Sequence, residues 1–220
     1  MACTVPASLK LVNLDTLSPL LAECPYPSGM VAIDRGITGN GFYPGARGFS
    51  VGSDPRQGIM LLGRDFGMHS YYVELSKKPN ADETMYTWRR TVDCALQPLG
   101  GVGVWAVNYL IGARRSGLAT GDLRDFVSSE EWKAYEGFCW HFLCRAVLLQ
   151  RPRRLVVYGK NNERDLSRVG RLEASRHIFR YDSEEHVAEI LYARHPSSLR
   201  SRVSQESARE WFRQLAVSMR

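Results

Sequence analysis

Four polar segments of this sequence each follow an apolar run directly, and they contain the residue types best suited to chemistry. Asp65 lies in the first segment, 63–67, and Asn108 follows the second apolar run. Gly159 follows the third run, and His195 opens a fourth segment rich in serine and arginine. A strand-end aspartate is often only a helix cap, and a single histidine is often structural. It is the succession of an acid, an amide, an imidazole and phosphate-binding types that points to a functional site.

Short apolar runs predict the strands that position these residues. Residues 59–62, 102–107 and 155–158 are typical of strands buried on both faces of a parallel sheet. Residues 187–193 fit a strand or a helix equally well. Alternating strands and helices predict a three-layer α/β/α sandwich with a four-stranded, mostly parallel sheet. Ligands bind such sheets at the carboxyl ends of the strands, where the four polar segments should meet.

Helical patterns separate the strands. Ser128 and Glu131 form a capping-box sequence that opens a long helix. Pro98 is expected to end an earlier helix, and Ser204 to cap the last one. The five predicted helices cover residues 8–24, 82–97, 128–152, 163–173 and 204–219.

Length and composition favour one domain over residues 1–220. An N-terminal helix with Gly- and Pro-rich loops (1–57) would precede an α/β core (58–220). No stretch approaches the roughly 18 apolar residues of a membrane helix, and the start of the chain lacks a secretory pattern. The five cysteines are scattered, which favours reduced thiols in a cytoplasm. We therefore expect a cytoplasmic monomer without a membrane association.

The charge is unevenly distributed along the chain. Residues 1–144 carry 13 Lys and Arg against 14 Asp and Glu, whereas residues 145–220 carry 16 against 9. Arginine supplies 24 of the 29 basic residues, and its planar guanidinium suits phosphate. The basic C-terminal third indicates a polyanionic partner, with nucleic acid the first candidate, although a basic surface also occurs on proteins that bind none.

The order of the polar segments resembles the uracil-DNA glycosylase superfamily. The first motif of that superfamily, G-x-D-P-[YG] or a variant, is matched by Gly63–Gly67, and the Asn after its second strand is matched by Asn108. A strand that ends in glycine is matched at Gly159, and the closing H-P-S-x-L at His195–Leu199. The resemblance spans residues 58–218.

Within the superfamily, the chain is most similar to a bacterial glycosylase-like group that shares the GRDFG motif and a Thr-Trp-Arg-Arg stretch, here 87–90. Phe66 stands where the usual motif has proline, and Gly67 where the strictest uracil enzymes carry tyrosine. The four-cysteine iron–sulfur pattern of some relatives is absent, so no cofactor and no metal are expected.

The resemblance implies a uracil-DNA glycosylase-like fold and a base flipped out of the DNA into a pocket. It assigns to Asp65 the carboxylate that stabilises the sugar cation and orients a water molecule. It assigns to His195 the hydrogen-bond donor to the pyrimidine 2-oxo oxygen. Asn108 would read the edge of the base.

The same resemblance places Phe66, Gly67 and Tyr71 around the base. Tyr71 or Tyr72 would stack on it, unless these rings only pack in the core. Because Gly67 has no side chain, the pocket is expected to admit a carbon-5 substituent. The alternative is that Gly67 only permits a turn with positive φ while Tyr71 fills the space.

The segment that begins at His195 predicts contacts with DNA. Serine and arginine side chains bind phosphates, and Leu199 is either a wedge that enters the gap left by the flipped base or a core leucine. Lys160 would add a further clamp on the backbone. The expected DNA-binding residues are Lys160, Ser197, Ser198, Leu199, Arg200 and Arg202.

These features predict a monofunctional DNA glycosylase, a hydrolase that removes uracil or a carbon-5-modified pyrimidine and leaves an abasic site. It would act in base excision and DNA repair, bound to the bacterial nucleoid. Two alternatives stay open: a phage-defence (antiviral) glycosylase for modified viral cytosines, and a glycosylase-like DNA-binding protein without catalysis. A metal site at Cys139, His141 and Cys144 is disfavoured because these residues lie in an apolar helix.

Overall fold

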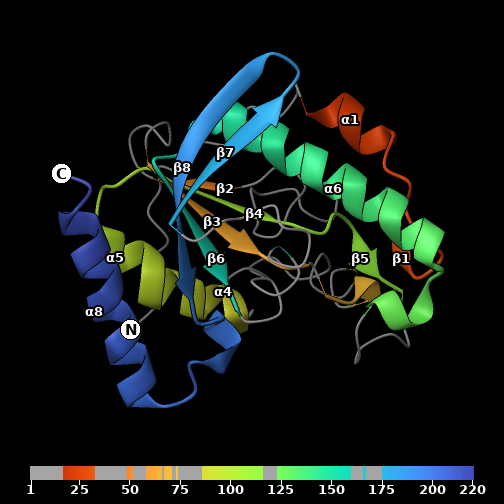
Figure 1. Ribbon diagram of the computed structural model, residues 1–220. Coiled ribbons are helices and arrows are strands. Elements are labelled where there is room, and N and C mark those ends of the chain that lie inside the picture. The colour runs from red at the N-terminus through yellow and green to blue at the C-terminus, as the bar shows by residue number, and fades with distance from the viewer. Residues whose placement is uncertain are drawn as a thin grey trace.

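The computed structural model describes residues 17–32, 49–51, 58–65, 67–70, 73, 86–115, 123–159, 166 and 175–220. Their fold is mixed α/β, with a mostly parallel sheet flanked by helices (Figure 1). The sheet has six strands in the order β2-β4-β3-β6-β8-β7. These are β2 (Phe49–Val51), β3 (Ile59–Gly63), β4 (Val104–Asn108), β6 (Arg154–Tyr158), β7 (Ser175–Tyr181) and β8 (Glu184–Ala193). A separate two-stranded sheet pairs β1 (Met30–Val31) with β5 (Ala113–Arg114).

The four central strands, β4, β3, β6 and β8, run parallel to one another. Every residue of β3 and β4 is buried, which confirms these strands as predicted from their continuous apolar runs. Residues 187–193, whose sequence fits a strand or a helix equally well, form part of the strand β8. The prediction of four strands was too low, because β2 and β7 pair antiparallel at the two edges.

Helices cover both faces of this sheet (Figure 1). On one face, α6 (Ser129–Gln150) packs against β7 and β8 through a core that includes Tyr135, Phe142 and Phe179. On the other face, α8 (Arg202–Val217) packs beside a helical stretch through Phe212 and Leu215. That stretch comprises α4 (Tyr86–Thr91), the π-helical η1 (Val92–Leu96) and α5 (Gln97–Leu99). Further helical segments include α1 (Ser18–Ala22) and the 3₁₀ turns η2 (Leu123–Phe126) and η3 (Pro196–Ser198).

Pro98 does not end its helix, contrary to the prediction. The stretch continues to Leu99, because the wide turn of η1 lets Gln97 donate to the Val92 carbonyl five residues back. In that pattern residue 98 would donate to the Asp93 carbonyl, and proline has no N–H to do so. Arg209 Nε of α8 donates to that carbonyl instead, at 3.2 Å. Because Pro98 cannot donate to the Asp93 carbonyl, this carbonyl accepts a hydrogen bond that attaches α8 to the helical stretch.

The cap of the last helix also lies elsewhere than predicted. Ser201, not Ser204, is the N-cap of α8: its backbone is extended and its hydroxyl accepts the Ser204 N–H at 3.1 Å. Ser204 is the third residue of the helix. Either serine suits a cap by type, so only the backbone path distinguishes them.

The hairpin of β7 and β8 extends beyond the helices in Figure 1. A turn at residues 182–183 joins the strands, and Asp182 adopts a left-handed φ of 53° there. Ile178 and Val187 lie opposite each other in this hairpin, and both are exposed. Arg176 and Arg180, also exposed, flank Ile178 on β7.

The predictions for the first and fourth helices can be compared with the structure only in part. The first, 8–24, corresponds to α1 where residues are described, and of 163–173 only Leu166 is described. Cys139 and Cys144 are buried in α6, as core packing requires, while His141 is exposed. Within the described ranges, no helix combines the length and apolar character needed to cross a membrane.

The capping box of α6 is present as predicted and gives a test of local stability. The Ser128 hydroxyl accepts the Glu131 N–H at 3.2 Å, and the Glu131 carboxylate accepts the Ser128 N–H at 3.1 Å. We expect Ser128→Ala to lower the free energy of unfolding by about 1 kcal/mol, measured by urea denaturation. Ser129→Ala, at the next and equally exposed position, is the control and should change it far less. Equal losses in the two variants would contradict a capping role.

Candidate active site

The carboxyl ends of the parallel strands bring the predicted acid, amide and imidazole to one edge of the sheet. Gly63 is in register with Asn108, and Tyr158 with Ala193. Asp65 therefore lies two residues beyond the end of β3, and His195 two residues beyond the end of β8, at the same edge. Asp65 is near enough to influence the pKa of His195 electrostatically.

Hydrogen bonds on both carboxylate oxygens fix Asp65. The Gly67 N–H donates to Oδ1 at 2.9 Å, and Arg114 Nη2 donates to Oδ2 at 2.6 Å. Arg64 Nη1 lies 3.7 Å from Oδ2. The side chain of Asp65 is only 13% exposed. Since a carboxylate oxygen has two acceptor positions, each can still accept a hydrogen bond from a water molecule or substrate.

Arg114 is a site residue that the sequence analysis did not identify. It lies in β5, opposite Met30 of β1, and its side chain is 10% exposed. Its backbone N–H also donates to the Gly67 carbonyl, at 2.8 Å. Arg114 thus holds the aspartate loop by both backbone and side chain. The sequence did offer one signal for this role: Arg114 lies in the segment that follows the strand ending at Asn108, where site residues are expected.

Gly67 adopts a left-handed φ of 72°, as a tight turn requires. Among the described residues, no atom lies within 4 Å of a Cβ built at this position. The positive φ agrees with the turn interpretation of Gly67. The described residues leave space beside it, but they do not include Tyr71, which the alternative interpretation places there. Phe66, Tyr71 and Tyr72, the other predicted neighbours of the base, lie outside the described residues, and so does Lys160.

The His195 loop is built around the imidazole itself. The Ser197 N–H donates to His195 Nδ1 at 3.2 Å, so the imidazole caps η3. Because a backbone N–H can only donate, Nδ1 must be the unprotonated nitrogen. The Ser197 hydroxyl lies 2.7 Å from the same nitrogen and must then donate to it as well. In the neutral ring the proton is therefore on Nε2, which becomes a donor.

Burial lowers the pKa of His195 below its ordinary value and outweighs the Asp65 carboxylate, which acts in the opposite direction. The imidazole is consequently neutral near pH 7. Gly159, which has a φ of 82°, packs closely against it: a Cβ at Gly159 would lie 3.2 Å from the His195 Cβ. The Tyr158 ring meets His195 edge-on, with centroids 6.5 Å apart.

Asn108 is buried at the same edge, where it is 2% exposed. The next two backbone N–H groups, of Tyr109 and Leu110, donate to the carbonyls of Gly63 and Arg64 at 2.9 and 2.8 Å. These bonds tie the segment after β4 to the aspartate loop. A ligand that reaches Asn108 must therefore be largely buried.

The predicted DNA-binding residues are not all disposed as the sequence suggested. Leu199 is 3% exposed, which favours the core-leucine interpretation over a wedge that projects from the surface. The Ser197 hydroxyl faces His195 Nδ1, and the Ser198 hydroxyl donates to the His195 carbonyl, so both serines build the loop. Arg200 and Arg202 are exposed, so solvent or a ligand can reach them. Arg202 lies 3.7 Å from Glu206. Both side chains are exposed, so a phosphate could replace Glu206 as the partner of Arg202 at little cost in free energy.

No group of three potential metal ligands occurs among the described residues. The site consists instead of a fixed carboxylate, a neutral imidazole and a buried amide. Such a set can orient water, stabilise positive charge and donate to an oxygen that gains negative charge.

Comparison of the sequence with protein-family models gives no match, and comparison with curated proteins gives none either.

The tautomer of His195 gives a test of this geometry. Nitrogen-15 NMR at pH 7 should show a neutral ring with the proton on Nε2. The ring should titrate below about pH 6.5, because burial disfavours its charged form. As the pH falls through that value, the unfolded chain takes up a proton first, so stability is lost and His195→Gln should reduce this loss. A proton on Nδ1, or titration above pH 6.5, would contradict the described loop.

Proposed function

We propose that this protein is a monofunctional DNA glycosylase that removes a flipped-out pyrimidine and leaves an abasic site. One observation carries the proposal: Asp65 and His195 share one sheet edge, the first fixed by two donors and the second fixed with its donor at Nε2. The resemblance of the GRDFG and HPSSL motifs supports it. We also propose that the fold is uracil-DNA glycosylase-like, since the four parallel strands fit the sheet expected for it.

The proposed reaction requires the two charges that this pair can stabilise. When the bond between sugar carbon-1′ and the base nitrogen breaks, the electron pair leaves with the base and the sugar becomes cationic. The Asp65 carboxylate would stabilise this cation and orient the attacking water. His195 Nε2–H would donate to the 2-oxo oxygen of the departing base. Water supplies the hydroxyl group of the abasic sugar and the proton of the released base.

A neutral imidazole suits this role better than a charged one. It donates a hydrogen bond from Nε2–H but carries no acidic imidazolium proton, and its lowered pKa keeps it neutral at working pH. A lyase would need a placed amine for a Schiff base. Lysine is scarce, with five in the chain, which favours simple hydrolysis.

Two other functions remain candidates. A phage-defence glycosylase would use the same machinery on modified viral cytosines, and the space that the described residues leave beside Gly67 favours a substrate with a carbon-5 group. A DNA-binding protein without catalysis would need neither the fixed carboxylate nor the fixed imidazole.

The decisive experiment incubates the protein with oligonucleotides that carry uracil, deaminated purines or carbon-5-modified cytosines. Alkali then cleaves any abasic site, and gel electrophoresis shows which base was removed. Cleavage at one or more pyrimidines supports the proposal. Binding of these oligonucleotides without any cleavage would favour the non-catalytic alternative.

The first functional prediction concerns catalysis. Asp65→Asn and His195→Ala should each lower single-turnover excision by about 100-fold or more, equivalent to about 2.7 kcal/mol in the barrier. DNA affinity, measured by fluorescence anisotropy, should change far less. Glu185→Gln, an equal carboxylate-to-amide change in the exposed hairpin, is the control. Because Asp65→Asn leaves Arg114 with a partly buried charge, folding must be checked by circular dichroism. Near-normal excision by folded Asp65→Asn would remove the aspartate from the mechanism.

The second functional prediction concerns the size of the base. Gly67→Tyr should abolish excision of carbon-5-modified pyrimidines while sparing uracil, because the new ring would occupy the space beside Gly67. Any side chain here also strains the left-handed backbone, by about 1–2 kcal/mol for most residues. Gly67→Asn separates the two effects, since asparagine tolerates this conformation, and it should keep more activity on the larger bases. A wild-type protein that acts on uracil alone would refute the open pocket.

A further inference from the structure

A cavity of about 510 Å³ is bounded on one side by the His195 loop. Its walls come from α8, from α4 and η1, and from the carboxyl ends of β6 and β8. The loop contributes Pro196 and Leu199 to the wall. Asp65, Asn108 and His195 are not among the described lining residues, so the cavity is distinct from the proposed catalytic site.

Aromatic side chains form much of the wall. Tyr158, Tyr192, Trp211 and Phe212 all line it. The rings of Trp211 and Phe212 meet edge-on with centroids 4.7 Å apart, and Tyr158 lies 6.4 Å from Phe212. Cavities of roughly 300–1,000 Å³ with aromatic walls are typical of sites for small molecules. This wall suits a planar, apolar ring system.

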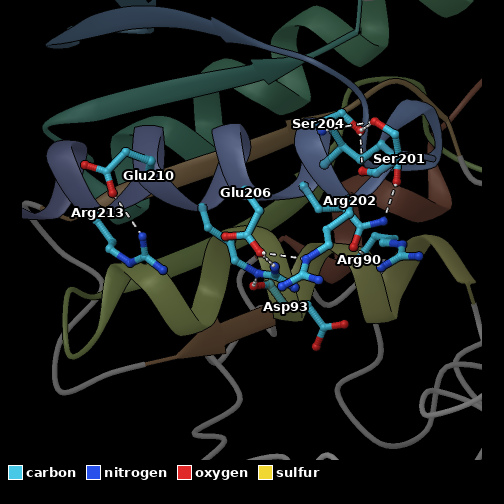
Figure 2. Close-up of polar contacts among 11 residues, drawn as sticks. Arg90, Asp93, Ser201, Arg202, Ser204, Glu206, Glu210 and Arg213 are labelled. Atoms are coloured by element: carbon cyan, nitrogen blue, oxygen red, sulfur yellow. Dashed lines mark hydrogen bonds and ion pairs between the residues drawn. The ribbon is translucent and has the colours of Figure 1, made fainter.

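The polar part of the lining favours an anion. The described lining residues include Arg90 and Arg194 but no aspartate or glutamate. Arg90 of α4 is positioned by a 2.7 Å hydrogen bond from Nη1 to Gln205 of α8. Figure 2 shows Arg90 below the first turn of α8, where Ser201 and Ser204 lie. Glu206, one turn along, is within 3.7 Å of both Arg202 and Arg209, which balances those charges outside the cavity.

We propose that this cavity binds a small aromatic anion, a planar ring system that carries a carboxylate or phosphate group. The ring contacts the aromatic wall, and the anionic group reaches the arginines, of which Arg194 is exposed to solvent. The proposal does not depend on the reaction proposed above. It needs only the cavity, its rings and the sign of its charge.

Isothermal titration calorimetry on the full chain tests it with three matched probes: 2-naphthoate, 2-naphthyl phosphate and uncharged 2-naphthalenemethanol. The two anions should bind about tenfold or more tightly than the alcohol, because only the anions can form charge-assisted hydrogen bonds with the arginines. The better of the two anions identifies the carboxylate or the phosphate as the natural group. Arg194→Gln should weaken both anions by a similar factor and leave the alcohol unchanged. Arg180→Gln, an exposed arginine of the outer hairpin, is the control.

Filling the cavity gives a second, independent test. Ala208→Trp should abolish binding of all three probes, and Ala208→Leu should weaken it even where the tryptophan variant folds poorly. Equal affinity for the alcohol and the anions would overturn the anion assignment. Naphthoate binding that survives both Ala208 variants would overturn the location. If an oligonucleotide binds instead of the naphthyl anions and is lost in the same variants, the cavity belongs to a nucleic-acid surface and the small-molecule assignment is wrong.

Discussion

The candidate site depends above all on the ion pair between Arg114 and Asp65. This contact joins the loop after β3 to the segment after β4, and through β5 it includes β1 as well. The neighbouring Arg115 N–H donates to the Gly29 carbonyl at 3.0 Å, which attaches the same segment to residues before β1. Because both partners are largely buried, removal of either would leave a poorly solvated charge. The position of Asp65 is thus determined by three chain segments together: its own loop, the segment after β4, and the residues around β1.

The histidine side of the site is held from behind by a different set of polar contacts. Gln205 accepts from Arg90 and donates to the Leu199 carbonyl at 3.1 Å, so one amide links α4, α8 and the loop. Arg209 adds a second link where Pro98 cannot donate. Through these contacts, the packing of α8 on its neighbour determines where the HPSSL segment lies. The two halves of the site are therefore supported by independent parts of the fold.

The sequence predicted best what depends on local pattern. The buried strands at 59–62 and 155–158 and the capping box at Ser128 are confirmed because apolar runs and cap pairs are local signals. It failed where the outcome depends on distant partners. Arg114 lies 49 residues from Asp65, and only the fold shows that they meet. β7 was missed because its exposed arginines interrupt the apolar pattern, and the motif alone does not show that Leu199 is only 3% exposed.

The two arginines of β7 also affect how the sheet ends. β7 is the last strand in the order, so among the described residues its outer edge has no neighbouring strand. Such an edge is a template for a second copy of the same strand. An antiparallel pairing centred on Ile178 would bring Arg176 of each copy opposite Arg180 of the other. Like charges in directly opposed positions disfavour a pairing, so the sequence of β7 itself opposes the growth of this sheet into an aggregate.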